Sequence, residues 1–247
     1  MHMINNGIEK MENKIEYNQI DSALELLKSR FPILRKLSES STFLTIIGSV
    51  SGGVLSNLLG NYAPMSKVQR LEDFCLQLDK DFKRLSIKME EFNDEILYIV
   101  EKTFRGALEN YQKEKLDAFR GILINSLTRT DRKEEEKELY INLVNSLSVL
   151  HLRLLSIFAN PDKSLNQRQL KFDSQSMWGD DFQTVLQKCL ECDTEIIKSI
   201  ITDLYNRGLI NMSSMGGVTT DKGKDLLFGR LTELGKRFIE YCQASED

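Results

Sequence analysis

The chain has 247 residues, of which 28% are charged and 41% hydrophobic, and this balance is typical of a folded globular protein. Its formal net charge of −4 argues against a protein whose whole surface binds nucleic acid, although a local basic patch is compatible with that total. With only three prolines and many Leu, Glu, Lys and Ile residues, the composition predicts a mainly α fold.

The N-terminal segment, residues 1–38, is polar at first and then has a helical apolar stripe that ends near Pro32. We predict an N-terminal helical segment there. The next segment, residues 39–66, has no formal charge after Glu39. Its apolar part is close to the ~20 residues that a bilayer span needs.

Small residues recur in this segment at every fourth position, at Gly48, Gly52, Ser56 and Gly60. On a helix, this spacing makes a ridge without bulky side chains, which is the small-xxx-small pattern of closely packed membrane helices. We therefore predict a transmembrane or oligomerisation helix. A soluble helical contact or a loop is the alternative, because Ser, Thr and Asn dilute the hydropathy and Gly is a poor helix former in water.

Residues 67–130 have the clearest periodicity in the chain. Apolar residues follow spacings of three and four without a break, at Val68, Leu71, Cys75, Leu78, Phe82, Leu85, Met89, Phe92, Ile96 and Ile99. The pattern predicts one long heptad helix with a coiled-coil seam. A second apolar face between Glu114 and Leu127 predicts a helical hairpin, in which this helix packs against the first. A bundle within a homo-oligomer is the alternative.

The C-terminal part, residues 139–247, follows the charge run at 130–138. It begins with a helix that stops before Pro161, and a polar insertion lies near residues 160–180. A short helix at 182–190 and a third helix at 194–207 follow, with Asp193 as the N-cap and Gly208 as the left-handed stop.

The end of the chain is predicted to form a β-hairpin followed by a last helix. Residues 209–212 and 226–231 are predicted as strands around a polar turn, and Thr232 is predicted to cap the last helix. Three helices, a hairpin and a helix make the winged-helix order, so the expected fold is an N-terminal helical bundle or coiled coil followed by a winged-helix (α+β) domain.

The charges of this domain do not favour duplex DNA. The third helix with its cap carries Asp193, Glu195, Lys198, Asp203 and Arg207, a net −1, and the wing carries Asp221, Lys222, Lys224 and Asp225, a net zero. Because several Lys and Arg contacts with phosphates supply most non-specific DNA affinity, we expect a sensor or docking module instead. The candidate contacts with a ligand or short nucleic acid are Lys163, Arg168, Lys171, Trp178, Lys198, Arg207, Lys222, Lys224 and Arg230. A tryptophan beside a polar loop more often anchors that loop on the core.

Few residues offer catalytic or metal chemistry. The only histidines are His2, near the terminus, and His151, in an apolar helical run where a partly buried residue with hydrogen-bond partners is the expectation. No Walker loop, dinucleotide fingerprint or metalloprotease motif is present. Cys189 and Cys192 form a close pair, but a zinc site needs two further ligands, so we expect buried structural cysteines. We predict no enzymatic activity, no catalytic residues, no metal and no cofactor.

Two stretches, at 203–210 and 231–238, resemble the end of the third helix and the post-wing helix of bacterial winged-helix regulators. Together with the glycine ridge, the layout resembles bacterial membrane effectors of anti-phage defence, Hailong-type effectors among them. The resemblance implies an oligomer in which a short nucleic acid or a partner protein acts on the winged-helix sensor to control membrane disruption. The alternative is a soluble, dimeric winged-helix transcription regulator that binds duplex DNA. The N-terminus has no secretory-signal pattern, so the expected location is the inner membrane or the cytoplasm of a bacterium.

Overall fold

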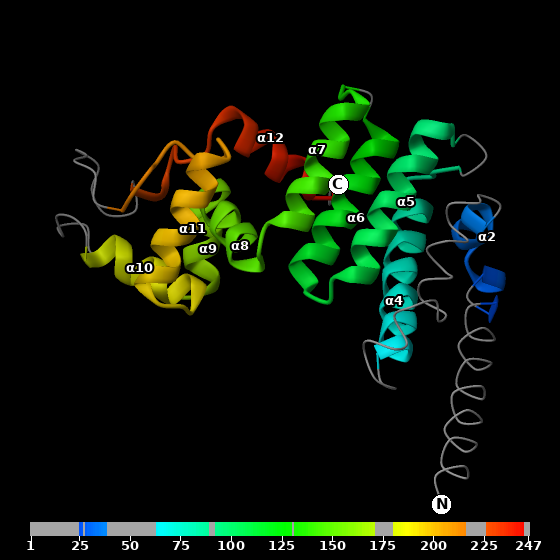
Figure 1. Cartoon of the computed structure of the whole chain (residues 1–247), viewed down its shortest axis with the longest axis horizontal. Coiled ribbons are helices and arrows are strands. Elements are labelled where there is room, and N and C mark those ends of the chain that lie inside the picture. The colour runs from blue at the N-terminus through cyan, green and yellow to red at the C-terminus, as the bar shows by residue number, and fades with distance from the viewer. Residues whose placement is uncertain are drawn as a thin grey trace, which may run out of the picture. The chain divides into compact units, whose positions relative to one another are not determined.

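The computed structural model describes residues 25–26, 28–38, 63–88, 92–129, 131–170, 180–215 and 226–244. In these ranges the chain is mainly helical (Figure 1), which confirms the prediction of a mainly α fold. They belong to two compact units. The first comprises residues up to 111 and residues 123–141, and the second comprises residues 112–122 and 142–247. Two helices, α6 (Lys113–Thr128) and α7 (Glu134–Ser146), contribute to both.

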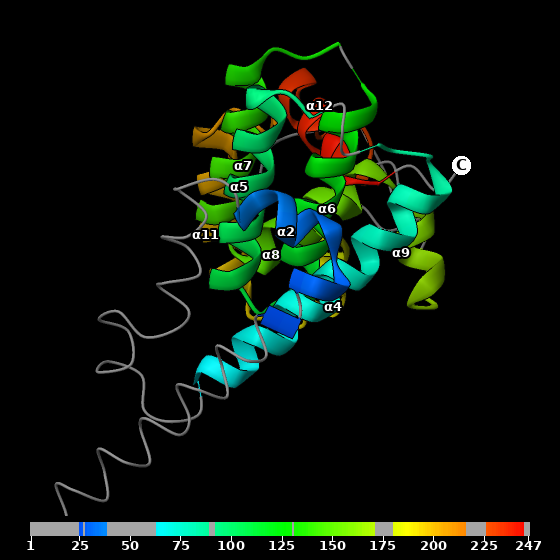
Figure 2. The ribbon, with the colours of Figure 1, turned by 90° about the vertical axis from the view of Figure 1, so that its right-hand side faces the viewer.

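The first unit contains α2 (Pro32–Ser38), α4 (Ala63–Arg84) and α5 (Asp94–Glu109), with the end of α6 and the start of α7. α4 packs against α5, and Figure 2 shows that it runs obliquely past it. The rings of Phe74 and Phe104 meet edge to face across this contact, with centroids 5.2 Å apart. The rings of Phe82 and Phe92, which both belong to the heptad pattern, also meet edge to face, with centroids 6.2 Å apart.

The predicted uninterrupted helix from Val68 to Ile99 is wrong, because the chain leaves the helix after Arg84. Ser86 adopts a left-handed conformation with φ of 54°, and the amide of Ile87 donates to the carbonyl of Phe82 at 2.9 Å. These two features form a Schellman-type stop. α5 then begins anew, with the side chain of Asn93 accepting from the amide of Ile96 at 2.9 Å. Consequently α4 folds back on α5, and its main partner is not the predicted stretch at 114–127.

The second unit is arranged around α8 (Val149–Ala159). This helix contacts α9 (Pro161–Gln167), α10 (Asp180–Leu190), α11 (Thr194–Asn206) and α12 (Glu233–Cys242). Leu154 and Leu155 of α8 are fully buried, as is Phe238 of α12. α8 is therefore the central core helix of this unit.

Local signals in the sequence correctly predict several helix ends in the second unit. Gly208 has φ of 69° after α11, and the amide of Leu209 donates to the carbonyl of Leu204 at 3.0 Å, as in a Schellman motif. Thr232 caps α12, and its hydroxyl accepts from the amide of Gly235 at 3.0 Å. Asp193 occupies the N-cap position of α11 with extended backbone, but its side chain makes no capping hydrogen bond.

The predicted polar insertion near 160–180 begins with a short helix, α9, which has Pro161 in its first turn, a position that suits the fixed φ of proline. The prediction of two strands in this unit is wrong. The two strands are reduced to a single antiparallel bridge between Ile210 and Leu231. The returning segment folds on itself instead, because the guanidinium of Arg230 donates to the carbonyl of Leu226 at 2.6 Å. The β wing is not shown in the described part of the chain, and residues 216–225 lie outside it.

Candidate functional site

A cavity of about 330 Å³, open to solvent, lies within the second unit, among the start of α6 and the helices α8, α9 and α12. That volume is at the lower end of the range of small-molecule pockets. Apolar residues line part of its wall, namely Leu152, Ile157 and Ile239. Polar and charged residues line the remainder, among them Glu114, Asp117, Arg153, Ser156, Gln167 and Arg168.

Arg153 and Glu114 neutralise each other on one side of this pocket. The Nε and Nη2 atoms of Arg153 lie 2.7 and 2.6 Å from Oε1 of Glu114. Burial raises the pKa of Glu114, but a backbone hydrogen bond and the guanidinium of Arg153 outweigh it and hold the pKa below its ordinary value. The carboxylate is thus ionised near neutral pH, and the pair presents little net charge to a ligand.

Arg168 and Asp117 present charges that are not neutralised in this way. Arg168 donates from Nη1 to the carbonyl of Ser164 at 3.1 Å, and no carboxylate pairs with it among the described residues. Asp117, on the exposed side of α6, likewise has no cationic partner within the described ranges. The pocket therefore offers one cation and one carboxylate to a bound molecule, beside an apolar wall.

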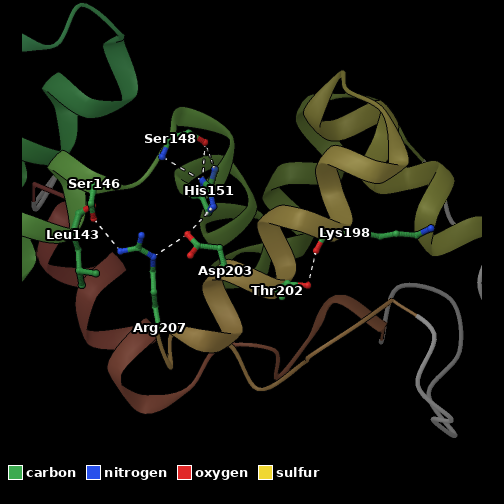
Figure 3. Close-up of polar contacts among 8 residues, drawn as sticks. All are labelled: Leu143, Ser146, Ser148, His151, Lys198, Thr202, Asp203 and Arg207. Carbon is green, nitrogen blue, oxygen red and sulfur yellow. Dashed lines mark hydrogen bonds and ion pairs between the residues drawn. The ribbon is translucent and has the colours of Figure 1, made fainter.

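A second polar feature joins α8 to α11 (Figure 3). Ser148 caps α8, and its hydroxyl lies 2.7 Å from Nδ1 of His151. The other ring nitrogen of His151, Nε2, lies 3.2 Å from Oδ2 of Asp203. Arg207 donates from Nε to the same carboxylate oxygen at 2.8 Å and from Nη1 to the hydroxyl of Ser146 at 3.1 Å. These five residues, the α8–α11 junction, form a continuous polar chain.

The junction contains Ser, His and Asp, the residue types of a hydrolase triad, but its geometry indicates a structural role. The amide of Ser148 donates to Nδ1 of His151 at 3.2 Å, so Nδ1 accepts and Nε2 carries the proton toward Asp203. Ser148 acts as a helix cap in a capping box. Burial lowers the pKa of His151, Asp203 opposes that effect, and Arg207 reinforces it. His151 is partly buried and hydrogen-bonded at Nδ1, as the sequence predicts, whereas Nε2 faces the carboxylate of Asp203 without a hydrogen bond of good geometry.

The surface of α11 carries few cations that are available to phosphates. Lys198 pairs with Glu195 at 2.8 Å, and Arg207 pairs with Asp203. The same helix exposes two large apolar side chains, Ile196 at 44% and Tyr205 at 45%. A helix that reads duplex DNA presents unpaired basic and polar groups to the major groove, so this surface is poorly suited to that role.

The predicted contact residues that the structure describes belong to separate elements of the second unit. Lys163 and Arg168 belong to α9 and its end, Lys198 and Arg207 belong to α11, and Arg230 binds the carbonyl of Leu226. The remaining predicted residues, Lys171, Trp178, Lys222, Lys224 and the ridge of Gly48, Gly52, Ser56 and Gly60, lie outside the described residues.

The sequence prediction missed Glu114, Asp117, Arg153 and Gln167, which line the pocket. Glu114 and Asp117 belong to a stretch that the sequence assigns to the preceding helical domain. Gly121 is the sequence signal that could have assigned Glu114 and Asp117 to the second unit. A Cβ atom at this position would lie only 2.0 Å from the carbonyl oxygen of Cys242. A glycine in mid-helix is therefore what lets α6 approach the end of α12 within this unit.

The cysteines show no sign of a metal or redox centre. Burial raises the pKa of both Cys189 and Cys192, so their thiols stay protonated at neutral pH. In the described part of the chain, no three His, Cys, Asp or Glu residues lie close enough together to hold a metal ion.

Comparisons with protein-family models, curated proteins and solved structures find no match for this chain. Among the described helices, no single one is long and apolar enough to cross a bilayer, and only α7 and α8 taken together, with a sharp bend between them, reach the required length and composition.

Proposed function

We propose that this chain is an oligomeric, membrane-associated effector of bacterial defence, in which the second unit is a ligand-sensing module. The observation that carries the sensing role is the open pocket among α6, α8, α9 and α12, with Arg168 and Asp117 at its edge. A concave site with an apolar wall and a few polar groups is the usual form of a small-ligand site.

The order of α8, α10, α11, the Ile210–Leu231 bridge and α12 supports a winged-helix relationship for this module. Lys198 and Arg207 each pair with a carboxylate of the same helix, and this favours a sensing role over binding to duplex DNA. A cation that is already paired neutralises phosphates poorly, so its binding to DNA would release few counterions. The membrane and oligomer part of the proposal rests on the sequence, namely the ridge of Gly48, Gly52, Ser56 and Gly60.

The proposal is tested by expressing the full chain in bacteria and following growth, membrane potential and the membrane fraction. We expect the protein in the membrane fraction and growth arrest when its trigger is present. Gly52→Leu adds bulk to the ridge and should relieve the arrest, whereas Val54→Leu, off the ridge, should not.

Two results would contradict this function. One is a protein that stays out of the membrane fraction and leaves growth unaffected under every trigger tested. The other is salt-sensitive, sub-micromolar binding to its own promoter duplex, which would identify a winged-helix transcription regulator.

A further inference from the structure

The pocket of the second unit is built for a particular charge pattern. Within the described ranges, the guanidinium of Arg168 makes one hydrogen bond, from Nη1 to the backbone carbonyl of Ser164, and its other N–H groups are available to a ligand. Asp117 offers a carboxylate that accepts hydrogen bonds, and neither side chain has an ionic partner within the described ranges. Arg153 and Glu114, which also line the pocket, are already paired with each other, so they add polarity without net charge.

From this arrangement we propose that the pocket binds a small zwitterion of the amino-acid class. The ligand's carboxylate would bind Arg168, its ammonium group would bind Asp117, and its side chain would pack on Leu152, Ile157 and Ile239. Arginine suits a carboxylate because its planar N–H fork matches the two oxygens. The inference rests on the proposed sensing role and names the class of molecule that is sensed.

The charges argue against two other ligand classes. A ligand with several phosphates would bring two or more negative charges beside Asp117 and Glu114, with Arg168 as the one cation lacking a carboxylate partner among the described pocket residues. A wholly apolar ligand would leave Arg168 and Asp117 desolvated and without partners, which is unfavourable. A molecule with one negative and one positive group satisfies both.

The test measures thermal shift and calorimetric binding of the full chain with each of the standard amino acids, and with inorganic phosphate and adenosine monophosphate as anionic probes. We expect one or a few amino acids to raise the melting temperature and the phosphates to have no effect. Arg168→Gln and Asp117→Asn should each weaken that binding about tenfold or more, because each removes a charge-assisted contact.

Matched control variants change exposed charges of the same unit that do not line the pocket. Lys188→Gln changes an exposed cation of α10, and Glu240→Gln changes an exposed carboxylate of α12. Both variants should bind like the wild type. The melting temperature of every variant without ligand shows whether Arg168 and Asp117 instead have a structural role, in which case it would fall.

Three outcomes overturn the inference: no amino acid binds the wild type, the phosphates bind better than any amino acid, or binding survives both pocket substitutions. The readout is independent of membrane association. A chain that binds an amino acid but never enters the membrane fraction would refute the proposed effector function and leave this inference standing.

Discussion

The close approach of α12 to the chain that follows α11 makes Gly235→Ala a sharp test of the packing in the second unit. A Cβ atom on Gly235 would lie 2.0 Å from the carbonyl oxygen of Leu209. This is more than about 1 Å short of van der Waals contact. The carbonyl cannot simply move away, because it accepts from the amide of Thr232 at 3.1 Å. The substitution must therefore displace α12 and, with it, break that hydrogen bond.

The expected loss of stability follows from three opposing contributions. Overpacking of a tight contact costs about 1–3 kcal/mol. The lost backbone hydrogen bond costs about 0.5–1.5 kcal/mol. Alanine in place of a helical glycine recovers about 1 kcal/mol. The net destabilisation by Gly235→Ala is then about 0.5–3.5 kcal/mol, opposite in sign to the usual effect of replacing glycine in a helix.

Urea unfolding of the full chain, followed by circular dichroism, measures this effect as a lower midpoint. Gly208→Ala is the matched control, because a Cβ atom there meets nothing within 4 Å and only the positive φ of 69° is unfavourable. That control should lose roughly 1–2 kcal/mol, and Gly208→Asn should lose less. An unchanged or raised midpoint for Gly235→Ala would refute the close approach of α12 to Leu209.

Three further substitutions test the second unit. Thr232→Ala removes the α12 cap and should destabilise the chain by about 1 kcal/mol in urea unfolding, whereas Thr232→Ser should not; equal losses would refute the capping role. His151 has a folded-state pKa below its unfolded value of about 6.5, so the folded chain binds the proton less well than the unfolded chain, and His151 contributes stability above about pH 6.5 that is lost as the pH falls through the lowered pKa. In His151→Gln the fall in melting temperature on acidification should therefore be smaller than in the wild type, and an equal fall would contradict the assigned shift. Lys198→Gln breaks an exposed ion pair with Glu195 and should change the free energy of unfolding by no more than about 0.5 kcal/mol. A larger loss would show that this ion pair stabilises the fold more than exposed ion pairs usually do.

The helix ends of the second unit could be predicted because the signals are local. Gly208 and Thr232 act through their own backbone and side chain, within one turn of the helix that they end or begin. The stop at Ser86 could not be predicted in this way, because a serine with positive φ has no distinctive sequence signature. The heptad pattern runs across the break, and it includes a buried residue on each side, Phe82 before it and Ile99 after it.

The pocket is the part of the candidate site that was least accessible to sequence analysis. It is lined by residues of α6, α8, α9 and α12, and α6 approaches the end of α12 closely at Gly121. Periodicity predicts which face of a helix is buried but not which helix covers it.

The ion pairs on α11, in contrast, can be predicted from the spacing of charged residues in the sequence. Lys198 follows Glu195 by three positions, and Arg207 follows Asp203 by four, which are the separations at which helical side chains meet. A net charge of −1 therefore understates how poorly this helix suits phosphate binding, since its two cations are already engaged. The net charge alone does not reveal this pairing, whereas the spacing does.

α8 connects the two polar features of the second unit. Arg153 lines the pocket, while His151, two residues earlier, faces Asp203 of α11. Residues two apart on a helix point about 200° from each other, so the pocket and the α8–α11 junction lie on opposite sides of one buried helix. Because a packed interior transmits displacement rather than absorbing it, a ligand that moves α8 at the pocket would act directly on the contacts of Asp203 and Arg207. If the proposed sensing role holds, the surface of α11 with its exposed Ile196 and Tyr205 is where we expect a ligand in the pocket to have its effect.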